Sequence, residues 1–327
     1  MRYNQGKPSF TNPVPIWEDV LFGTVAFGKS CFFSAGRVLW ELEQIFQYGV
    51  TRMYMKLKDG KSKVLTLSYD DGVVQDIHLV DILDRHGLKA TFNINTGLYL
   101  PEDVTRERYY GRMTLPESLK LYINSGHEVA VHGLTHPYLE KLEADELLTE
   151  ILDDRKNIEQ QYGTFARGMA YPFGTYSEDV IDALEKCGIC YGRTVKNTQG
   201  FGFPANWLEW HPTCHHNDPK LMELAQRFAE SSVWHMGDNW LFYLWGHSYE
   251  FDNRDNWDVI ERFAEYMGGR EDIWYATNIE IYDYVKAYKR LQTSVDRSIV
   301  HNPSAVDVWF AHKKQIFCIK AGETLHL

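Results

Sequence analysis

The stretch VLTLSYDDGVVQD, at residues 64–76, joins an apolar run to two adjacent carboxylates and a glycine. The run from Val64 to Tyr69 is typical of a strand that is buried on both faces, as the strands of parallel sheets are. Asp70 and Asp71 follow at the carboxyl end of that strand, where like charges repel each other unless a partner offsets them. The sequence therefore predicts a polar site at the mouth of a buried strand.

The same alternation of strand and helix continues along the first half of the chain. Strands are expected at residues 63–69, 89–95, 127–133, 166–174 and 189–195, and helices at 73–87, 114–126, 143–163 and 177–188. This alternation indicates parallel strands with crossover helices, in either a barrel or a doubly wound sheet. In both architectures the active residues gather at the carboxyl ends of the strands. Asp70, His132 and Tyr171 are expected at such ends.

The rest of the chain contains further elements and suggests where domains begin and end. Helices are expected at 220–232, 256–268 and 278–292, an aromatic strand at 240–247, and two strands with a Lys-Lys turn within 305–327. We expect an N-terminal extension at residues 1–52, with a helix near 37–49. A main α/β domain is expected at 53–290, and a small C-terminal β appendage at 291–327.

Composition limits the kind of protein. The chain has 327 residues, 44% of them hydrophobic, and a net charge of −11, which argues for a globular core and against general affinity for nucleic acid or an anionic membrane. No run approaches the ~20 apolar residues of a membrane span, and the sequence shows no signal-peptide pattern, so a cytoplasmic location is expected. The five cysteines, including the pair in CGIC at 187–190, are expected to be reduced and structural.

Two histidines stand four residues apart in HGLTH, at residues 132–136. On a helical turn this spacing brings two imidazoles to one face, where one metal ion can bind both. With one carboxylate they would form a facial triad with open positions for water and substrate. One carboxylate of the Asp70–Asp71 pair would bind the metal, whose charge offsets the repulsion, and the other would be free to act as a base. The alternative is an Asp-Asp-Gly turn that caps the next helix.

The segments LSYDDG, HGLTH, AYPFG and LWGHSYEFD resemble, in that order, the motifs of the NodB-homology polysaccharide deacetylases, carbohydrate esterase family 4. The similarity runs from about residue 62 to about residue 290. It implies a distorted (β/α) barrel and a divalent metal, with Zn²⁺ expected, and makes residues 53–290 a NodB-like catalytic domain. By the same resemblance Asp70 is the general base, and the metal ligands are Asp71, His132 and His136.

The third motif of the family is normally Arg-x-Pro-Tyr, and the matching residues here are Ala170, Tyr171, Pro172 and Phe173. The resemblance implies that the Phe173 backbone N–H stabilises the oxyanion, since a backbone donor does not depend on which aromatic ring follows it. Tyr171 and Pro172 are then expected beside the substrate. The arginine that is missing from this motif normally holds the base.

Two other arginines are candidates for holding the base. Arg167 precedes the third motif, where a surface position is expected. Arg193 lies on an otherwise apolar strand, and a charge there favours a specific partner. We therefore expect Arg193 to orient Asp70.

The last motif implies that His247 is the general acid, which protonates the leaving amine. The Asp-x-x-Asp-Trp run that normally orients this histidine is absent, and Glu209–Trp210 is the nearest match. We expect Glu209 to orient His247, and Trp210 to contact the substrate. Gly133 replaces the Ser or Thr that usually follows the first ligand histidine. The segment TCHH, at 213–216, is expected to be a loop beside the substrate rather than a second metal site.

These residues favour a metal-dependent hydrolase that removes N-acetyl groups from an acetylated amino-sugar polymer or oligomer. One alternative keeps the chemistry and changes the substrate to a cyclic amide, a ureide or another small molecule with a C–N bond. A closed pocket would favour that alternative, and a long aromatic cleft a glycan. A second alternative is a catalytically silent carbohydrate-binding relative, which the presence of the base, the acid and all three ligands disfavours. The expected partner is the substrate, an acetylated glycan or a small amide, and the sequence predicts no oligomeric state.

Overall fold

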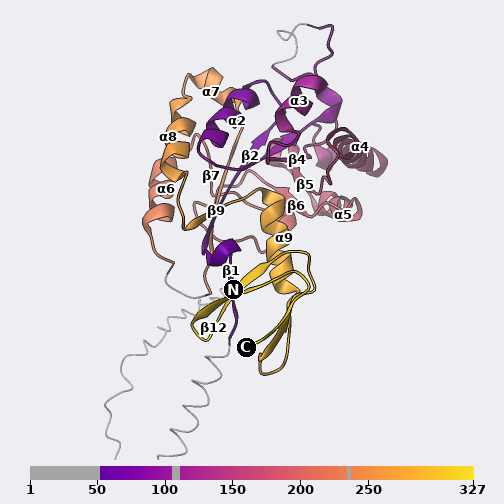
Figure 1. Ribbon diagram of the computed structural model, residues 1–327. Helices are drawn as coiled ribbons and strands as arrows, with labels where there is room; N and C mark the ends of the chain where they lie inside the picture. The colour runs from indigo at the N-terminus through magenta and orange to yellow at the C-terminus, as the bar shows by residue number, and fades with distance from the viewer. Residues whose placement is uncertain (1–51, 105–110, 234–236) are drawn as a thin grey trace, which may run out of the picture. The chain divides into compact units, whose positions relative to one another are not determined.

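The computed structural model of the protein describes residues 52–104, 111–233 and 237–327 (Figure 1). The extension expected at residues 1–52 and its helix near 37–49 lie outside these ranges, apart from Arg52. Nothing in the described part tests the boundary between this extension and the main domain, which stays a prediction.

Eight strands form one sheet at the centre of the described part. They are β2 (Lys63–Asp70), β3 (Ala90–Ile94), β4 (Glu128–Val131), β5 (Gly168–Ala170), β6 (Tyr191–Arg193), β7 (Cys214–His215), β8 (Trp240–Gly246) and β9 (Ile273–Tyr275). Their order is β6-β5-β4-β3-β2-β8-β7, with β9 beside β2, and every pairing is parallel. The predicted fold class, a distorted (β/α) barrel, is confirmed.

A short segment around residues 210–215 connects the two edges of this curled sheet. The Trp210 N–H donates to the carbonyl of Gly192 in β6, at 2.8 Å, so that one end of the segment is bonded to the first edge. Four residues later, β7 pairs with β8 at the opposite edge. The same segment therefore reaches both edges of the sheet and closes the barrel.

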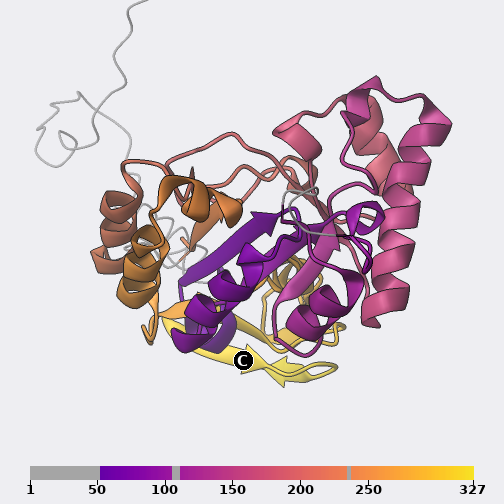
Figure 2. The ribbon, with the colours of Figure 1, turned by 90° about the horizontal axis from the view of Figure 1, so that it is seen from above.

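Helices cover the outside of the sheet, and Figure 2 shows them around the central strands. They are α2 (Gln75–Arg85), α3 (Leu115–Tyr122), α4 (Ala144–Tyr162), α5 (Glu178–Lys186), α6 (Leu221–Glu230), α7 (Tyr249–Arg254), α8 (Asp258–Met267) and α9 (Asn278–Lys289). The expected starts of two helices are confirmed, because the side chains of Thr114 and Ser177 cap α3 and α5. Within the described ranges, no helix has the length and apolar character needed to cross a bilayer.

The central strand β2 is buried along its whole length. Its apolar side chains, such as Leu65 and Leu67, pack in a core with helices α2, α6 and α8. Asp70 stands at its last position and is 2% exposed, so a carboxylate enters the interior where the strand ends. This burial of charge is what makes the carboxyl end of β2 a candidate site.

The C-terminal segment forms two small antiparallel sheets. One has the order β1-β12-β13 and the other β10-β11-β14. Their strands are β1 (Tyr54–Lys56), β10 (Gln292–Thr293), β11 (Ile299–His301), β12 (Val308–His312), β13 (Gln315–Ile319) and β14 (Thr324–His326). The Lys-Lys turn lies between β12 and β13, with φ values of 48° and 65° at Lys313 and Lys314. Since β1 pairs with β12, residues close to the start of the main domain complete the appendage.

Candidate active site

Strands of the central sheet bring together the residues that the sequence singles out. Asp70 ends β2, His132 follows β4, Tyr171 follows β5, Arg193 ends β6 and His247 follows β8. A pocket of about 480 Å³ lies at these strand ends. It is lined by Asp70, Asp71, His132, His136, Tyr171, Phe173, Gly174, Val195, Trp245, His247 and Tyr249.

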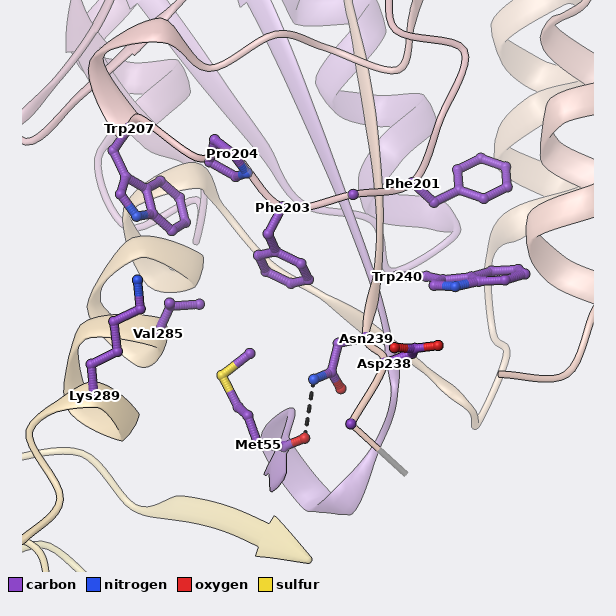
Figure 3. A pocket seen from close by; sticks show the side chains of 12 residues that line it. Met55, Phe201, Phe203, Pro204, Trp207, Asp238, Asn239, Trp240, Val285 and Lys289 are labelled. Carbon is purple, nitrogen blue, oxygen red and sulfur yellow. Dashed lines mark hydrogen bonds between the residues drawn. The ribbon is translucent and has the colours of Figure 1, made fainter. Parts of the chain in front are cut away.

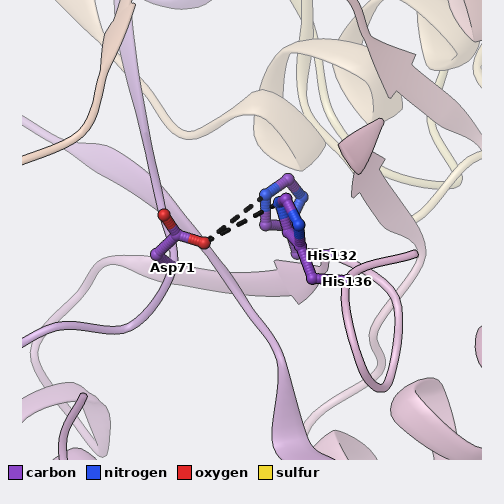
Figure 4. Close-up of side chains that lie close together, drawn as sticks. All are labelled: Asp71, His132 and His136. Atoms are coloured by element: carbon purple, nitrogen blue, oxygen red, sulfur yellow. Dashed lines mark ion pairs between the residues drawn. The ribbon is translucent and has the colours of Figure 1, made fainter. Parts of the chain in front are cut away.

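Asp71, His132 and His136 form one cluster (Figure 4). The Oδ1 atom of Asp71 lies 3.9 Å from the Nε2 atom of His132 and 3.9 Å from that of His136. One ligand atom from each residue lies within 4.8 Å of the other two. A single ion with bonds of ~2.0–2.2 Å can bridge atoms at such separations. The group is a candidate metal centre with two imidazoles and one carboxylate.

The hydrogen bonding of His132 fits a metal ligand. Its Nδ1 atom donates to the carbonyl oxygen of Ala170 at 2.8 Å, which leaves Nε2 without a proton in the neutral ring. That Nε2 atom is buried and has no hydrogen-bond partner among the described residues. Burial also lowers the pKa of His132 to about 4, so the ring is neutral near pH 7. A buried, unpaired lone pair beside a carboxylate and a second imidazole is suited to a divalent metal.

Helix α4 holds the loop that carries both histidines. Asp154 accepts the backbone N–H of His132 at 3.0 Å. Glu150 accepts the N–H of Thr135 at 2.8 Å and its hydroxyl at 2.6 Å. Gly133, between them, has a φ of 77°, a conformation that glycine adopts without the strain a Ser or Thr would have. A glycine at this position therefore fits the backbone of the loop.

Three other residues of the site have left-handed backbone conformations. The φ values are 85° at Asp71, 58° at His136 and 58° at Phe173. Residues other than glycine rarely adopt such values, and they concentrate at functional sites, where the surrounding structure enforces them. The strained positions here are two of the candidate metal ligands and the turn beside them.

Asp70 is buried and held from two sides. Its Oδ2 atom is in close contact with a terminal nitrogen of Arg193, and its Oδ1 atom accepts from Nδ2 of Asn93 at 2.8 Å. Burial by itself would raise the pKa of Asp70. Arg193 and two nearby histidines outweigh that effect and lower the pKa to about 2. Asp70 is therefore a carboxylate at neutral pH.

Arg193, rather than Arg167, is the arginine beside Asp70. The Arg193 side chain is 0% exposed, and its guanidinium carbon lies 4.6 Å from the centre of the Trp245 ring. Arg167 instead pairs with Asp283 at 2.6 Å, on a more exposed part of the domain. The geometry agrees with the sequence-based choice, and the catalytic role of Arg193 stays a proposal.

His247 lies between two carboxylates. Its Nδ1 atom is 2.7 Å from Oε1 of Glu250, and its Nε2 atom is 3.7 Å from Oδ2 of Asp70. Burial lowers the pKa of His247, but Glu250 and the nearby aspartates outweigh it, so that the pKa lies above its usual value. The ring can therefore carry a proton at a pH where an exposed histidine would have lost it.

The prediction that Glu209 orients His247 is wrong, because Glu250 occupies that position. Glu209 accepts from the Tyr176 hydroxyl at 3.0 Å and from Nδ2 of Asn206 at 2.9 Å. A signal for Glu250 was present in the segment HSYE, where the carboxylate follows the histidine by three residues. Residues three apart on a helical turn face each other, and α7 begins within this segment.

The segment TCHH, at residues 213–216, lies behind Glu250. Nε2 of His215 is 3.3 Å from Oε1 of Glu250, and Nε2 of His216 is 3.5 Å from its Oε2. Asn217 donates to the same Oε2 atom at 2.7 Å. His215, His216 and His247 together outweigh the effect of burial and hold the pKa of Glu250 well below its usual range. Within the described part, none of residues 213–216 lines the pocket, which corrects the expectation of a substrate-side loop.

His215, His247 and Glu250 are also close enough together to hold an ion. The Nδ1 atom of His215 accepts the backbone N–H of Asn217 at 3.1 Å, so its Nε2 atom carries the proton and points to Glu250. Nδ1 of His247 also faces that carboxylate at hydrogen-bond distance. The group is therefore a hydrogen-bonded cluster, with Asp71, His132 and His136 as the better metal site.

Residues 57–192, which contain both histidines of the metal cluster and the aspartate pair, match the family model described as polysaccharide deacetylase. Over these residues the chain resembles the polysaccharide deacetylases, and the domain that contains them is called the deacetylase-like domain. The family resemblance seen in the motifs is thereby confirmed.

Two curated relatives of the deacetylase-like domain have related names. The peptidoglycan-N-acetylglucosamine deacetylase of Listeria monocytogenes is 29% identical over 125 residues, which cover 38% of this chain and 24% of the relative. The chitooligosaccharide deacetylase of a Bradyrhizobium species is 29% identical over 147 residues, which cover 43% of this chain and 59% of the relative. The chain thus spans less than two thirds of the length of either relative.

A solved structure of a putative polysaccharide deacetylase from Mycobacterium smegmatis shares the fold of the deacetylase-like domain. It has a TM-score of 0.50 and 16% sequence identity, and the match covers 73% of this chain and 95% of the other. At this identity the likeness supports the architecture alone.

The rim of the candidate active-site pocket carries two exposed aromatic rings. Phe173 and Tyr138 stack with ring centres 3.9 Å apart and an interplanar angle of 13°. They are 48% and 40% exposed, respectively. In the described part of the chain, no acceptor is bonded to the Phe173 backbone N–H. The turn therefore offers both an aromatic surface and an unpaired donor beside His136.

Three residues expected at the substrate are largely withdrawn from it. Tyr171 lines the pocket, but it is 1% exposed and its hydroxyl donates to the carbonyl of Leu208 at 2.7 Å. Pro172 is buried and is not among the lining residues. Trp210 is 1% exposed and packs against Tyr191 in a separate core cluster. The predicted substrate contacts of Pro172 and Trp210 are therefore wrong, because both side chains are buried in the protein interior.

A larger cavity of the domain lies away from this chemistry (Figure 3). It has a volume of about 620 Å³ and is lined by residues that include Met55, Phe203 and Trp240. Trp240 is the first residue of β8, whereas His247 follows the last. The cavity is therefore at the opposite end of the strand, and cavity size does not locate the active site.

Proposed function

We propose that the deacetylase-like domain is a metal-dependent hydrolase that removes N-acetyl groups from an acetylated amino-sugar polymer or oligomer. The observation that carries this proposal is the convergence of three groups on one pocket. They are a ligand set for a metal, a carboxylate held in its ionised form, and an imidazole with a raised pKa. The names of the relatives support an acetylated glycan as the substrate.

Asp71, His132 and His136 would hold the metal. Zn²⁺ suits two imidazoles and one carboxylate, with an open position left for a further ligand. When bound, such an ion polarises the acetyl carbonyl and lowers the pKa of the attacking water. Ala170 and Asp154 would orient this ligand set, because they accept hydrogen bonds from the ring and from the backbone N–H of His132.

Asp70 would accept the proton of the attacking water. Its low pKa keeps it unprotonated, and its contacts with Arg193 and Asn93 fix its orientation. The backbone N–H of Phe173 would donate to the oxyanion that forms when water adds to the carbonyl. A donor without an internal acceptor needs no rearrangement before it does so.

His247 would then protonate the departing nitrogen. The hydrogen bond from its Nδ1 to Glu250 fixes the ring, so that Nε2 is the atom that exchanges a proton in the pocket. Acetate and a free amine are the products. Nε2 lies 3.7 Å from Oδ2 of Asp70, so the acid and the base would both reach the same part of the pocket.

The exposed aromatic pair at the rim supports a sugar rather than a small cyclic amide or ureide. Phe173 and Tyr138 present flat apolar rings to solvent beside the candidate metal ligands. Such a surface can stack against the apolar face of a pyranose. A small amide confined to the pocket would not reach Tyr138, which is not among the lining residues. The intact base, acid and ligand set disfavours a silent binding protein.

The reaction and its metal dependence can be tested together. We expect the protein to release acetate from N-acetylated glucosamine oligomers, to lose this activity after chelation, and to recover it with Zn²⁺. Enzymatic acetate assays on oligomers of increasing length, set beside small cyclic amides and ureides, measure this directly. Turnover of the small amides alone would overturn the proposed substrate, and activity that survives complete removal of the metal would overturn the proposed chemistry.

Replacing His247 by Ala is expected to slow amide cleavage by ~10²–10⁴-fold, the range for a positioned general acid. An activated acetate ester should be affected much less, because its leaving group departs without a proton. Steady-state rates on both substrates, with metal content determined for each sample, provide the comparison. An equal loss on amide and ester would show that His247 supports the site and does not act as the acid.

The metal identity in the cell and the cytoplasmic location stay predictions. Elemental analysis of protein purified without added metal would identify the ion. Fractionation of the producing cells would locate the protein.

A further inference from the structure

A buried carboxylate on helix α2 joins two loops of the active site. Asp76 is 0% exposed and accepts three hydrogen bonds. Its Oδ1 atom accepts the hydroxyl of Ser248 at 2.6 Å. Its Oδ2 atom accepts the backbone N–H of Val73 at 3.1 Å and the hydroxyl of Tyr122 at 2.7 Å. The three donors are one backbone N–H and two side-chain hydroxyls of this chain.

Two of these donors belong to segments that carry the proposed acid and base. Ser248 directly follows His247, is 0% exposed and stands at the start of α7, which contains Glu250. Val73 stands three residues after Asp70, in the loop that leaves β2. The carboxylate of Asp76 thus contacts both segments at once, although neither the acid nor the base is its direct partner.

We propose that Asp76 is a positioning residue for the general acid. Through the Ser248 hydroxyl it fixes the turn that carries His247. Through the Val73 N–H it holds that turn in place relative to the loop that follows Asp70 at the end of β2. The inference rests on the proposed role of His247 and extends it to a residue on another element.

The geometry gives this link a specific effect. Glu250 orients the His247 ring through Nδ1 and is itself held by His215 and Asn217 on the side of β7. Asp76 belongs to α2 and anchors the turn from outside. Displacements of about 1 Å can cost ~10²-fold in rate when a reacting group must be aligned. Loss of the anchor should therefore reduce proton donation more than it reduces binding of metal or substrate.

The test compares Ser248→Ala with Tyr122→Phe in the full chain. Each substitution removes one hydroxyl donor from the same buried carboxylate. The Tyr122 side of Asp76 contacts helix α3, whereas the Ser248 side contacts the turn of the acid. The second variant is therefore a matched control for the general loss of a buried hydrogen bond, and thermal unfolding of both proteins reports that loss.

We expect Ser248→Ala to lower kcat on an N-acetyl amide by ~10-fold, with the rate on an activated acetate ester within about twofold of the parent. KM and metal content should stay unchanged. Tyr122→Phe should leave the ratio of the rate on the amide to the rate on the ester unchanged. Equal losses on amide and ester in Ser248→Ala, or an amide-selective loss in Tyr122→Phe, would overturn the inference.

A conservative change at Asp76 itself provides a rescue. In Asp76→Asn the side-chain oxygen can still accept from Val73 and Tyr122, and the new NH₂ group can donate to the Ser248 hydroxyl, which can turn to accept. This variant should keep the amide-to-ester ratio of the parent, because the link to Ser248 is retained. A ratio reduced as far as in Ser248→Ala would contradict the proposed link.

His247→Ala, measured on the same two substrates, separates this inference from the proposed function. If His247→Ala loses activity mainly on the amide and Ser248→Ala does not, the inference about Asp76 is overturned, while the proposed role of His247 stands. Equal losses on both substrates in His247→Ala would overturn the acid itself, and the inference with it.

Discussion

Asp70→Asn is expected to reduce deacetylation by at least ~10²–10⁴-fold, the usual contribution of a positioned base. The amide that replaces the carboxylate cannot take up a proton from water at neutral pH. It is nearly the same size as the carboxylate, and its oxygen can still face Arg193. Metal affinity should stay close to that of the parent, because the proposed ligands are Asp71, His132 and His136. Acetate release and Zn²⁺ titration of the same samples measure the two effects.

His132→Ala is the matched variant on the metal side. It removes one of the two imidazoles and leaves Asp70 and its partner Arg193 in place. Both metal affinity and turnover should then fall. Release of the metal by Asp70→Asn would show that the roles of the two adjacent aspartates are assigned the wrong way round.

Arg193→Met is expected to destabilise the fold by about 3–5 kcal/mol, the cost of leaving one member of a buried ion pair without its partner. Arg193 is 0% exposed and Asp70 is 2% exposed, so little water reaches the carboxylate left behind. Without the guanidinium, burial should also raise the pKa of Asp70. The base is active as a carboxylate, so the acid limb of the pH–rate profile should move to higher pH. Chemical unfolding and pH–rate measurements test the two effects separately.

The double variant Asp70→Asn with Arg193→Met completes a thermodynamic cycle. If the cost in Arg193→Met comes from an unpaired carboxylate, neutralising Asp70 should recover part of it, and the two changes should be non-additive. Additive losses of stability would instead mean that Arg193 contributes mainly by packing against Trp245, whose ring lies 4.6 Å from its guanidinium carbon.

Much of the fold, and the grouping of the metal cluster, could be predicted because their signals are local. Buried parallel strands produce apolar runs such as residues 64–69, and capped helices produce starts such as Thr114. The pairing of Arg193 with Asp70 could also be predicted, because a charge on an apolar strand favours a buried partner. The histidines of HGLTH were grouped by their four-residue spacing, but the segment is a loop with a left-handed backbone at Gly133 and His136 and not the helical turn expected. The strained, left-handed backbone conformations of Asp71 and His136 could not be predicted from the sequence.

The errors arose where distant segments meet. Glu209 was chosen because a Trp follows it, but its position in space depends on a loop that closes the barrel. The same closure places Trp210 in the core instead of at the substrate. Glu250 could have been found from its three-residue spacing to His247. The contribution of His215 and His216 could not, since it depends on the pairing of β7 with β8.

The way the barrel closes divides the active site into parts of unequal local stability. The strand β7 has two residues, and among the described strands it pairs with β8 alone. Short edge elements open at a lower free energy than the centre of a sheet. The histidines behind Glu250 lie on this weak edge, whereas the metal ligands follow β2 and β4, within the continuous part of the sheet. A brief opening of the pairing between β7 and β8 would therefore remove the support of His247 while the metal stayed bound. Catalytic activity is then expected to be lost before the protein unfolds.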